Sequence, residues 1–218
     1  KNYTADGEVI RRMTFTVDEW RKFYKAMDDI YTAKKHTKHL TADDIFERQL
    51  VRHYFLFAAN SGLRSSELRK LEWHNVSTFD DTTSSGRKLV LADLLVEKKT
   101  SKVRKNRRVI SRGGEYIRRW KSICKEHNKQ TEGIVFSVSG KEYSRSNTHK
   151  HFRKILSLTD IDDERQRALV PYSLRHFMIT ERVKSGLSFN QIAIMCGTST
   201  RQIENTYLHL NDEMLKTS

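Results

Sequence analysis

Hydrophobic residues in this chain recur with two different periods, and the changes of period divide the sequence into three parts. Near the N-terminus, apolar side chains follow a helical spacing over about 17–31 and again over about 42–59. From 76 to 110 the pattern is typical of strands, and from about 147 onward it is helical again. A mainly α domain with a small antiparallel β-sheet (α+β) is therefore expected.

The N-terminal helices begin and end at residue types that are typical of helix boundaries. Thr16 and Glu19 form a capping box at the start of the first helix. Gly62 interrupts the second helix, and a short helix is expected over 65–73. The polar and basic residues 33–41 predict an irregular connection between the first two helices.

The middle of the chain predicts a small sheet. Residues 89–96 have a strong strand pattern, 76–79 a weaker one, and 107–110 are the expected partner of the strong strand. The basic stretch 97–106 joins the last two strands, so we expect a β-hairpin with a long charged tip. Two further elements follow, an amphipathic helix around 116–124 and a short strand over 134–138.

Positive charge is concentrated in one part of the chain. The 218 residues contain 41 Lys and Arg against 27 Asp and Glu, which gives a formal net charge of +14. Between 98 and 121 there are eleven basic residues and one acidic residue. Such a block favours nucleic acid as a partner over an anionic membrane, because no amphipathic helix here pairs this basic face with a wide apolar one. A solvated basic face is the alternative.

Composition excludes several other classes of protein. Two cysteines, Cys124 and Cys196, are too few for a disulfide framework or a cysteine-rich zinc module. No apolar run approaches the ~18 residues of a membrane span, and no signal peptide is recognisable. No internal repeat or interior linker divides the chain, so residues 1–218 are expected to form one domain.

Three short segments contain polar residues that no simple structural need explains. In Ser61-Gly62-Leu63-Arg64-Ser65-Ser66-Glu67-Leu68, Arg64 lies at a helix start, where free backbone N–H groups favour an anion. The second segment is Pro171-Tyr172-Ser173-Leu174-Arg175-His176-Phe177, and the third is Ile194-Met195-Cys196-Gly197-Thr198, followed by Tyr207. Taken singly, each is better explained as a surface ion pair, an edge histidine or a tyrosine at the border of the core.

Taken together and in this order, the segments resemble the catalytic domain of the tyrosine recombinases, the phage integrase family. That family has a G-L-R-x-x-E-L box, a lysine in a β-hairpin, an H-x-L-R-H box, a G-H or G-W step and, shortly after it, a nucleophilic tyrosine. The corresponding residues here are Gly62 to Leu68, Lys99, Tyr172 to His176, Gly197-Thr198 and Tyr207. The resemblance covers nearly the whole chain.

The resemblance implies a reaction at a DNA phosphodiester that needs no metal, nucleotide or other cofactor, and the sequence contains no P-loop. Tyr207 would attack phosphorus, while Arg64 and Arg175 would donate hydrogen bonds to its non-bridging oxygens. Lys99 would protonate the departing 5′ oxygen. The same boxes contain two further candidate catalytic residues, Glu67 and His176.

Two positions depart from the family pattern. Tyr172 stands where a histidine or lysine is expected to transfer protons, and Thr198 stands where histidine or tryptophan contacts the scissile phosphate. Because the nucleophile and the arginine pair remain, we expect a slower enzyme and not an inactive one. Lys98 and Lys102 compete with Lys99 for the general-acid role, since all three lie near the end of a strand.

The charged hairpin is expected to contact DNA phosphates. Its candidate DNA-binding residues are Lys98, Lys102, Arg104, Lys105, Arg107 and Arg108. The resemblance further implies double-stranded DNA as the partner, a homotetramer on DNA in the full-length protein, and a role for accessory DNA-bending factors. The family usually carries a DNA-clamping domain ahead of the catalytic one, so this chain is expected to be a fragment without that domain. We expect the protein to be cytoplasmic and nucleoid-associated, encoded by a prokaryotic host or a virus.

The expected function is site-specific DNA recombination, integration or excision, through a covalent 3′-phosphotyrosyl intermediate. One alternative is a helix-turn-helix DNA-binding protein with residues 199–206 as the recognition helix, which the spacing of Ala193, Gly197 and Ile203 allows. It leaves the other boxes unexplained. A second alternative, suggested by the two departures, is a catalytically inactive recombinase-like DNA-binding protein.

Overall fold

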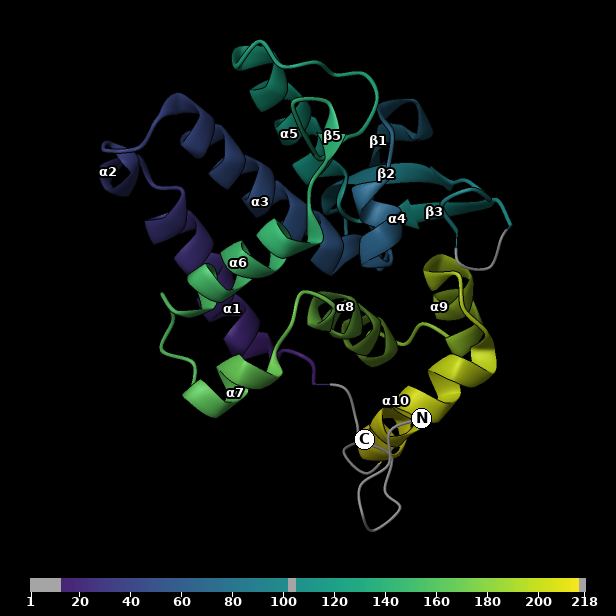
Figure 1. Cartoon of the computed structure of the whole chain (residues 1–218). Helices are drawn as coiled ribbons and strands as arrows, with labels where there is room; N and C mark the ends of the chain where they lie inside the picture. The colour runs from purple at the N-terminus through teal and green to yellow at the C-terminus, as the bar shows by residue number, and fades with distance from the viewer. Residues whose placement is uncertain (1–12, 102–104, 216–218) are drawn as a thin grey trace.

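The computed structural model describes residues 13–101 and 105–215, and most of its elements are helices, with a small sheet at one side (Figure 1). The expected α+β class with a small antiparallel sheet is confirmed. Within these two ranges, no helix combines the length and the apolar content that crossing a membrane requires.

The first helix begins at the predicted capping box. Thr16 accepts a hydrogen bond through its hydroxyl from the Glu19 N–H at 3.1 Å, and the Glu19 carboxylate accepts one from the Thr16 N–H at 2.8 Å. Two of the free donors at the start of α1 (Val17–Lys25) are thereby satisfied. The helix continues into a π-helical segment, η1 (Ala26–Tyr31), where the apolar spacing predicted only regular helix.

The second long helix, α3 (Ala42–Ser61), ends at Gly62 as predicted. The segment before it is less irregular than expected, because it contains the short helix α2 (Lys34–Thr37). The helix predicted over 65–73 is divided into α4 (Ser65–Arg69) and the 3-10 turn η2 (Trp73–Asn75).

Three antiparallel strands form the main sheet in the order β1-β2-β3. They are β1 (Val76–Thr82), β2 (Lys88–Val96) and β3 (Arg107–Ser111). β1 is longer than predicted because its pairing with β2 continues to Thr82 opposite Lys88. One face of the sheet packs on the core, so the alternation along each strand decides which side chains point inward.

In the described part of the chain, the sheet is followed by α5, a two-stranded hairpin and five further helices. Their bounds are α5 (Gly114–Glu126), β4 (Ser137–Val138), β5 (Lys141–Glu142), α6 (Arg145–Leu156), α7 (Asp163–Ala168), α8 (Ser173–Lys184), α9 (Phe189–Cys196) and α10 (Thr200–Leu215). The strand predicted over 134–138 is wrong in extent. Ile134 makes only an isolated bridge with Glu72, and strand pairing is limited to β4 and β5.

Two clusters of buried side chains hold these elements together. The larger surrounds α3, where Phe55 and Phe57 are fully buried, and includes Trp120 of α5, whose Nε1 donates to the Val135 carbonyl at 2.7 Å. The smaller joins α8, α9 and α10 and contains Tyr207. The helices that bear the second and third sequence boxes are therefore packed directly against one another.

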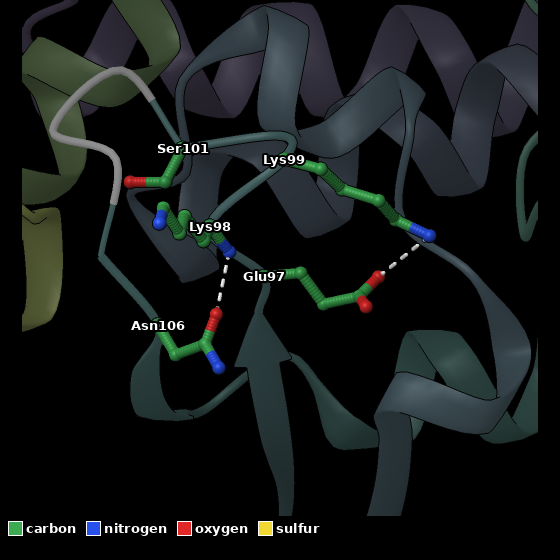
Figure 2. Close-up of a pocket in the computed structure, with 5 residues that line it drawn as sticks. All are labelled: Glu97, Lys98, Lys99, Ser101 and Asn106. Atoms are coloured by element: carbon green, nitrogen blue, oxygen red, sulfur yellow. Dashed lines mark hydrogen bonds and ion pairs between the residues drawn. The ribbon is translucent and has the colours of Figure 1, made fainter.

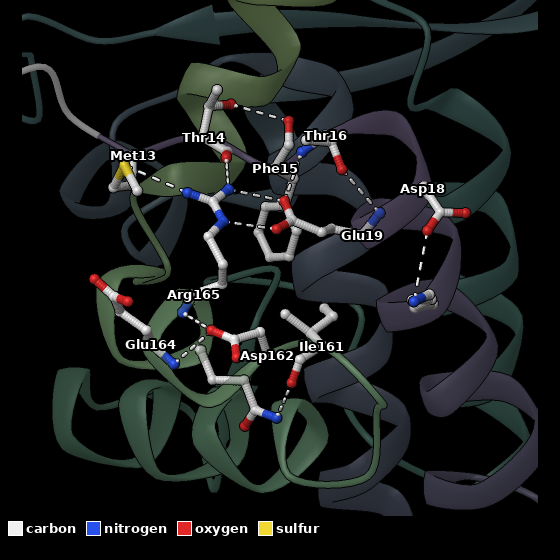
Figure 3. Close-up of polar contacts among 12 residues, drawn as sticks. Met13, Thr14, Phe15, Thr16, Asp18, Glu19, Ile161, Asp162, Glu164 and Arg165 are labelled. Atoms are coloured by element: carbon white, nitrogen blue, oxygen red, sulfur yellow. Dashed lines mark hydrogen bonds and ion pairs between the residues drawn. The ribbon is translucent and has the colours of Figure 1, made fainter.

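Arg165 of α7 ties the start of the described chain to the C-terminal half (Figure 3). Its Nε donates to the Glu19 Oε1 atom at 2.7 Å, and its Nη2 donates to the Glu19 Oε2 atom and the Thr14 carbonyl, each at 2.9 Å. Burial alone would raise the pKa of Glu19, but Arg165 and the hydrogen bonds from Thr16 outweigh it and hold this pKa below its ordinary value.

Candidate active site

Arg64 is placed by the turn between α3 and α4. Gly62 adopts the left-handed conformation that favours glycine (φ 65°), and the Met178 Cε atom of α8 occupies the space next to it. Arg64 follows as the N-cap residue of α4. Its Nη1 donates to the Glu67 Oε1 atom at 2.9 Å, and its Nη2 donates to the Gly197 carbonyl at 2.6 Å. This one side chain therefore links α4 to the C-terminal end of α9.

Glu67 is a buried carboxylate that several donors share. Besides the Arg64 guanidinium, it accepts the Arg64 backbone N–H at 2.9 Å and two hydrogen bonds from Arg107, at 3.0 and 2.7 Å. Burial alone would raise the pKa of Glu67, but the hydrogen bonds and charge of Arg107, together with Arg64, hold it below its ordinary value. The residue is therefore an anion that fixes two guanidinium groups.

Arg107 is turned inward, whereas the sequence analysis groups it with the DNA-contacting residues of the hairpin. Its side chain is only 11% exposed because it shares a face of β3 with the buried residues Val109 and Ser111. Arg108 and Ile110 occupy the outer face of the same strand. The alternation of side chains along β3 predicts this inward placement, whereas the net charge of the segment alone does not.

Arg175 completes a cluster of three arginines around the end of α9. The side chain is buried, and it donates from Nη1 to the Gly62 carbonyl and from Nη2 to the Cys196 carbonyl, the latter at 2.9 Å. The last carbonyls of a helix carry a partial negative charge and attract cations. Gly197 follows in the left-handed conformation (φ 60°), and the Arg107 guanidinium lies where a Cβ atom would be.

The charge of this cluster suits an anion that carries more than one negative charge. Arg64, Arg107 and Arg175 contribute three positive charges, and the Glu67 carboxylate contributes one negative charge, so positive charge is in excess. Arginine stays protonated at neutral pH and presents its donors in a fixed plane. All three sequence boxes thus converge on one site through backbone carbonyls that sequence patterns do not reveal.

The tyrosine of the third box lies beside the second box. Tyr207 of α10 is 5% exposed, and its hydroxyl is hydrogen-bonded to the Nδ1 atom of His176 on α8. Their ring centroids are 5.9 Å apart. The residue that binds the tyrosine hydroxyl, His176, directly follows Arg175 in α8.

The two residues that depart from the family pattern lie at the ends of neighbouring helices. Tyr172 is the N-cap residue of α8, and its ring packs edge-on against His176, with centroids 5.1 Å apart and planes at 75°. Thr198 follows α9 and donates its backbone N–H to the Ala193 carbonyl at 3.0 Å. Tyr172 therefore borders the imidazole that contacts Tyr207.

Two of the candidate general acids, Lys98 and Lys99, line an open cavity of about 530 Å³ at the base of the hairpin tip, together with Glu97, Ser101 and Asn106 (Figure 2). The Lys99 side chain is 60% exposed, and its amine lies 3.2 Å from carboxylate oxygens of both Glu72 and Glu97. The hydrogen bonds that the Lys99 amine donates to Glu97 and Glu72, together with their charges, raise the pKa of Lys99 above its ordinary value. Lys98 directs its amine away from Glu97, to the other side of the strand (Figure 2).

The other hairpin candidates are only partly described. Lys105 and Arg108 are exposed, and the Arg108 Nε donates to the Asp93 Oδ1 atom at 2.7 Å on the outer face of the sheet. Lys102 and Arg104 lie outside the described residues. Among the residues that the structure does describe, there is no group of three or more His, Cys, Asp and Glu side chains that could hold a metal ion.

Fold and site together define the catalytic domain of a tyrosine recombinase, since the boxes that are separate in the sequence meet at the C-terminal end of α9. The family model described as "Phage integrase family" matches residues 14–214. This chain belongs to the phage integrase family, and the resemblance found from its motifs is confirmed.

Solved structures of recombinases share the fold. The XerH site-specific recombinase bound to palindromic difH substrate, in a post-cleavage complex, has a TM-score of 0.67 at 15% identity, over 98% of this chain and 54% of that chain. The XerA recombinase has a TM-score of 0.62 at 17% identity, over 96% of this chain and 62% of that one. For a lambda integrase tetramer bound to a Holliday junction the TM-score is 0.52 at 12% identity, over 90% of this chain and 50% of that chain.

These likenesses concern only part of each relative. The chain spans 54% of the XerH chain and 62% of the XerA chain, and the low identities establish a common fold and nothing finer. No curated protein sequence is significantly similar to this chain.

Proposed function

We propose that this chain is the catalytic domain of a site-specific recombinase that cleaves and rejoins DNA strands through a covalent 3′-phosphotyrosyl intermediate. The observation that carries the proposal is the cluster of Arg64, Arg107 and Arg175 at the C-terminal end of α9, beside the helix that holds the Tyr207 hydroxyl. Membership of the phage integrase family supports it.

In this mechanism the Tyr207 oxygen forms a bond to phosphorus as the bond from phosphorus to the 5′ oxygen breaks. The transition state places additional negative charge on the non-bridging oxygens, and preorganised donors stabilise that charge more than the charge of the ground state. Arg64 and Arg175 donate to these oxygens. Arg107 holds the Glu67 carboxylate beside Arg64 through both of its Nη atoms, so we assign it to positioning that carboxylate.

The departing 5′ oxygen takes a proton from a lysine of the hairpin, for which Lys99 and Lys98 are the described candidates. The phosphotyrosyl bond retains the energy of the broken phosphodiester bond. Attack by a 5′ hydroxyl of another strand therefore reverses the step and releases Tyr207 without an external energy source. The outcome is an exchange of strands between two DNA segments.

Double-stranded DNA is the proposed partner, and the exposed side chains of Lys98, Lys105 and Arg108 are proposed to contact its phosphates. The solved relatives include DNA complexes, and the lambda integrase tetramer on a Holliday junction supports a homotetramer of the full-length protein on DNA. Accessory DNA-bending factors, and a cytoplasmic, nucleoid-associated location in a prokaryotic host, remain part of the proposal.

The helix-turn-helix alternative has less support. The helix over 199–206 is present as the first part of α10, but Ile203 and Tyr207 of that helix are buried against α8 and α9. A recognition helix needs its contact face in the major groove of DNA. The arginine cluster also has no role in that alternative.

Adduct formation on a nicked suicide substrate tests the proposal. In such a DNA, the fragment that carries the 5′ hydroxyl diffuses away after cleavage, so the covalent complex accumulates. Wild-type protein should give a covalent complex on denaturing gels, whereas Tyr207→Phe should bind the same DNA with unchanged affinity and give none. A covalent complex retained by Tyr207→Phe would reject the nucleophile. A wild-type protein that binds cognate DNA without forming a complex would favour the inactive recombinase-like protein.

A further inference from the structure

The Tyr207 hydroxyl, which the proposed function makes the nucleophile, is bound to the Nδ1 atom of His176. The two residues come from different helices, α10 and α8. His176 is 8% exposed and Tyr207 is 5% exposed, so their contact is shielded from bulk water. A phenol with a reference pKa of ~10 is a weak nucleophile at neutral pH unless an adjacent base takes its proton.

We infer that His176 is the general base of strand cleavage and takes the proton from the Tyr207 hydroxyl as its oxygen attacks phosphorus. This inference rests on the proposed function. During cleavage the proton moves from the Tyr207 oxygen to Nδ1 of His176, the new oxygen–phosphorus bond forms, and the bond to the 5′ oxygen breaks. During rejoining a 5′ hydroxyl attacks phosphorus and gives its proton back to the hairpin lysine, the bond from phosphorus to the Tyr207 oxygen breaks, and His176 returns the proton to that oxygen. The histidine is therefore neutral at the end of each cycle.

To take the Tyr207 proton, Nδ1 of His176 must act as the hydrogen-bond acceptor, so the imidazole must be the tautomer with its proton on Nε2. The adjacent Arg175 directs its guanidinium to backbone carbonyls at the ends of α3 and α9, and Arg64 is paired with Glu67. From α9, the Cys196 thiol lies in the same buried cluster as Tyr207, and burial raises its pKa. The guanidinium groups of Arg175 and Arg64 are thus each directed to partners other than His176.

Tyr172 occupies the position where the family pattern expects a proton-transfer group, but its chemistry favours another role. It precedes His176 by one helical turn, so both side chains lie on the same side of α8. Their edge-to-face contact restricts rotation of the imidazole. Since a phenol accepts a proton poorly at neutral pH, we assign Tyr172 to positioning the imidazole and His176 to proton transfer.

His176→Gln tests this assignment in the intact chain. Glutamine can still hydrogen-bond to the Tyr207 hydroxyl, but it cannot take a proton at neutral pH. The rate constant of adduct formation on the nicked duplex should fall about 100-fold or more, and DNA affinity should be unchanged. Replacement of Tyr207 by a fluorinated tyrosine, whose phenol is more acidic, should restore most of this loss because it ionises without a base.

His53→Gln is the matched control. His53 is also buried, and its Nδ1 atom lies 2.7 Å from the Gln49 carbonyl, but it is on α3 and packs against Trp120 away from the site. The same substitution there should leave the rate constant of adduct formation unchanged. A comparable loss in both variants would show a general effect of removing a buried histidine and overturn the inference.

The remaining outcomes separate this inference from the proposed function. If wild-type protein forms the adduct and His176→Gln matches its rate, or loses rate without rescue by fluorotyrosine, His176 is not the base and the proposed function stands. If fluorotyrosine rescues Tyr172→Phe and not His176→Gln, the role belongs to Tyr172 and the inference is overturned. If wild-type protein forms no adduct, the proposed function and this inference are rejected together.

Discussion

The guanidinium of Arg107 faces both carboxylate oxygens of Glu67, with Nη1 at 3.0 Å from Oε1 and Nη2 at 2.7 Å from Oε2. Glu67 in turn accepts hydrogen bonds from the side chain and the backbone of Arg64. An arginine of the third strand and an arginine of the first box are therefore held by one buried anion. Arg107 holds Glu67 beside Arg64, and its side chain, 11% exposed, points into the protein and not onto the hairpin surface.

We expect Arg107→Met to destabilise the protein by about 3–5 kcal/mol, because it leaves the buried Glu67 carboxylate without its bidentate partner. Cleavage should slow, while the salt dependence of DNA binding should stay that of the wild type. Arg108→Met is the comparison, since the exposed Arg108 pairs only on the outer face of the sheet and is a proposed phosphate contact: this variant should change stability little and flatten the salt dependence. A flatter salt dependence in Arg107→Met would show that this side chain contacts phosphate after all.

The stability of the protein should fall in acid through Glu67. Its pKa in the folded state lies below the ordinary glutamate value of ~4.3. The stabilisation that the ionised carboxylate gives to the folded state is therefore complete above ~4.3 and is lost as the pH falls through the lower pKa of the folded state. Without Arg107 this pKa should rise, and the loss should begin at a higher pH. Urea midpoints between pH 7 and pH 3 for the wild type and Arg107→Met measure this, and parallel curves would contradict it.

Arg64→Ala and Arg175→Ala should each slow cleavage by about 100- to 1000-fold, the usual effect of removing one preorganised donor at a transition state. Lysine at either position should restore little activity, because it lacks the planar fork that meets two acceptors at once. Single-turnover rates, with circular dichroism to monitor folding, are the measurement. A wild-type rate in either alanine variant would mean that the scissile phosphate binds elsewhere.

The hairpin should contribute affinity for DNA of any sequence. Combined replacement of the exposed Lys98 and Lys105 by alanine should weaken binding and reduce the salt slope by up to about one unit for each lost contact. Lys125→Ala, an exposed position near the end of α5, serves as the control. An unchanged slope in the double variant would place both lysines in solvent when DNA is bound.

The proton donor to the 5′ oxygen can be identified with a 5′-bridging phosphorothioate, whose sulfur leaves without protonation. We expect this substrate to restore cleavage by Lys98→Ala, because the competing Lys99 is paired with Glu72 and Glu97 in a way that raises its pKa. Rescue of Lys99→Ala alone would return the role to the lysine that the family resemblance indicates.

The two departures from the family pattern should limit the rate of the enzyme without abolishing its activity. Tyr172→His and Thr198→His should both be tolerated, and at least one should speed cleavage without changing DNA affinity, because each restores an imidazole at a position next to the site. Adduct rates on the nicked substrate provide the test. Slower cleavage in Tyr172→His would reflect its contact with the His176 imidazole, and slower cleavage in both variants would contradict this prediction.

The sequence by itself determined the helices, the charged hairpin, the family and the identity of the candidate nucleophile, because hydrophobic period, capping residues and ordered motifs are local properties. It missed the π-helical turn and the short α2, since neither has a distinct apolar spacing. Only the tertiary structure turned Arg107 toward Glu67 and brought Tyr207 to His176. Those contacts join residues 40 and 31 positions apart, and they depend on strand alternation and helix packing that no single segment specifies.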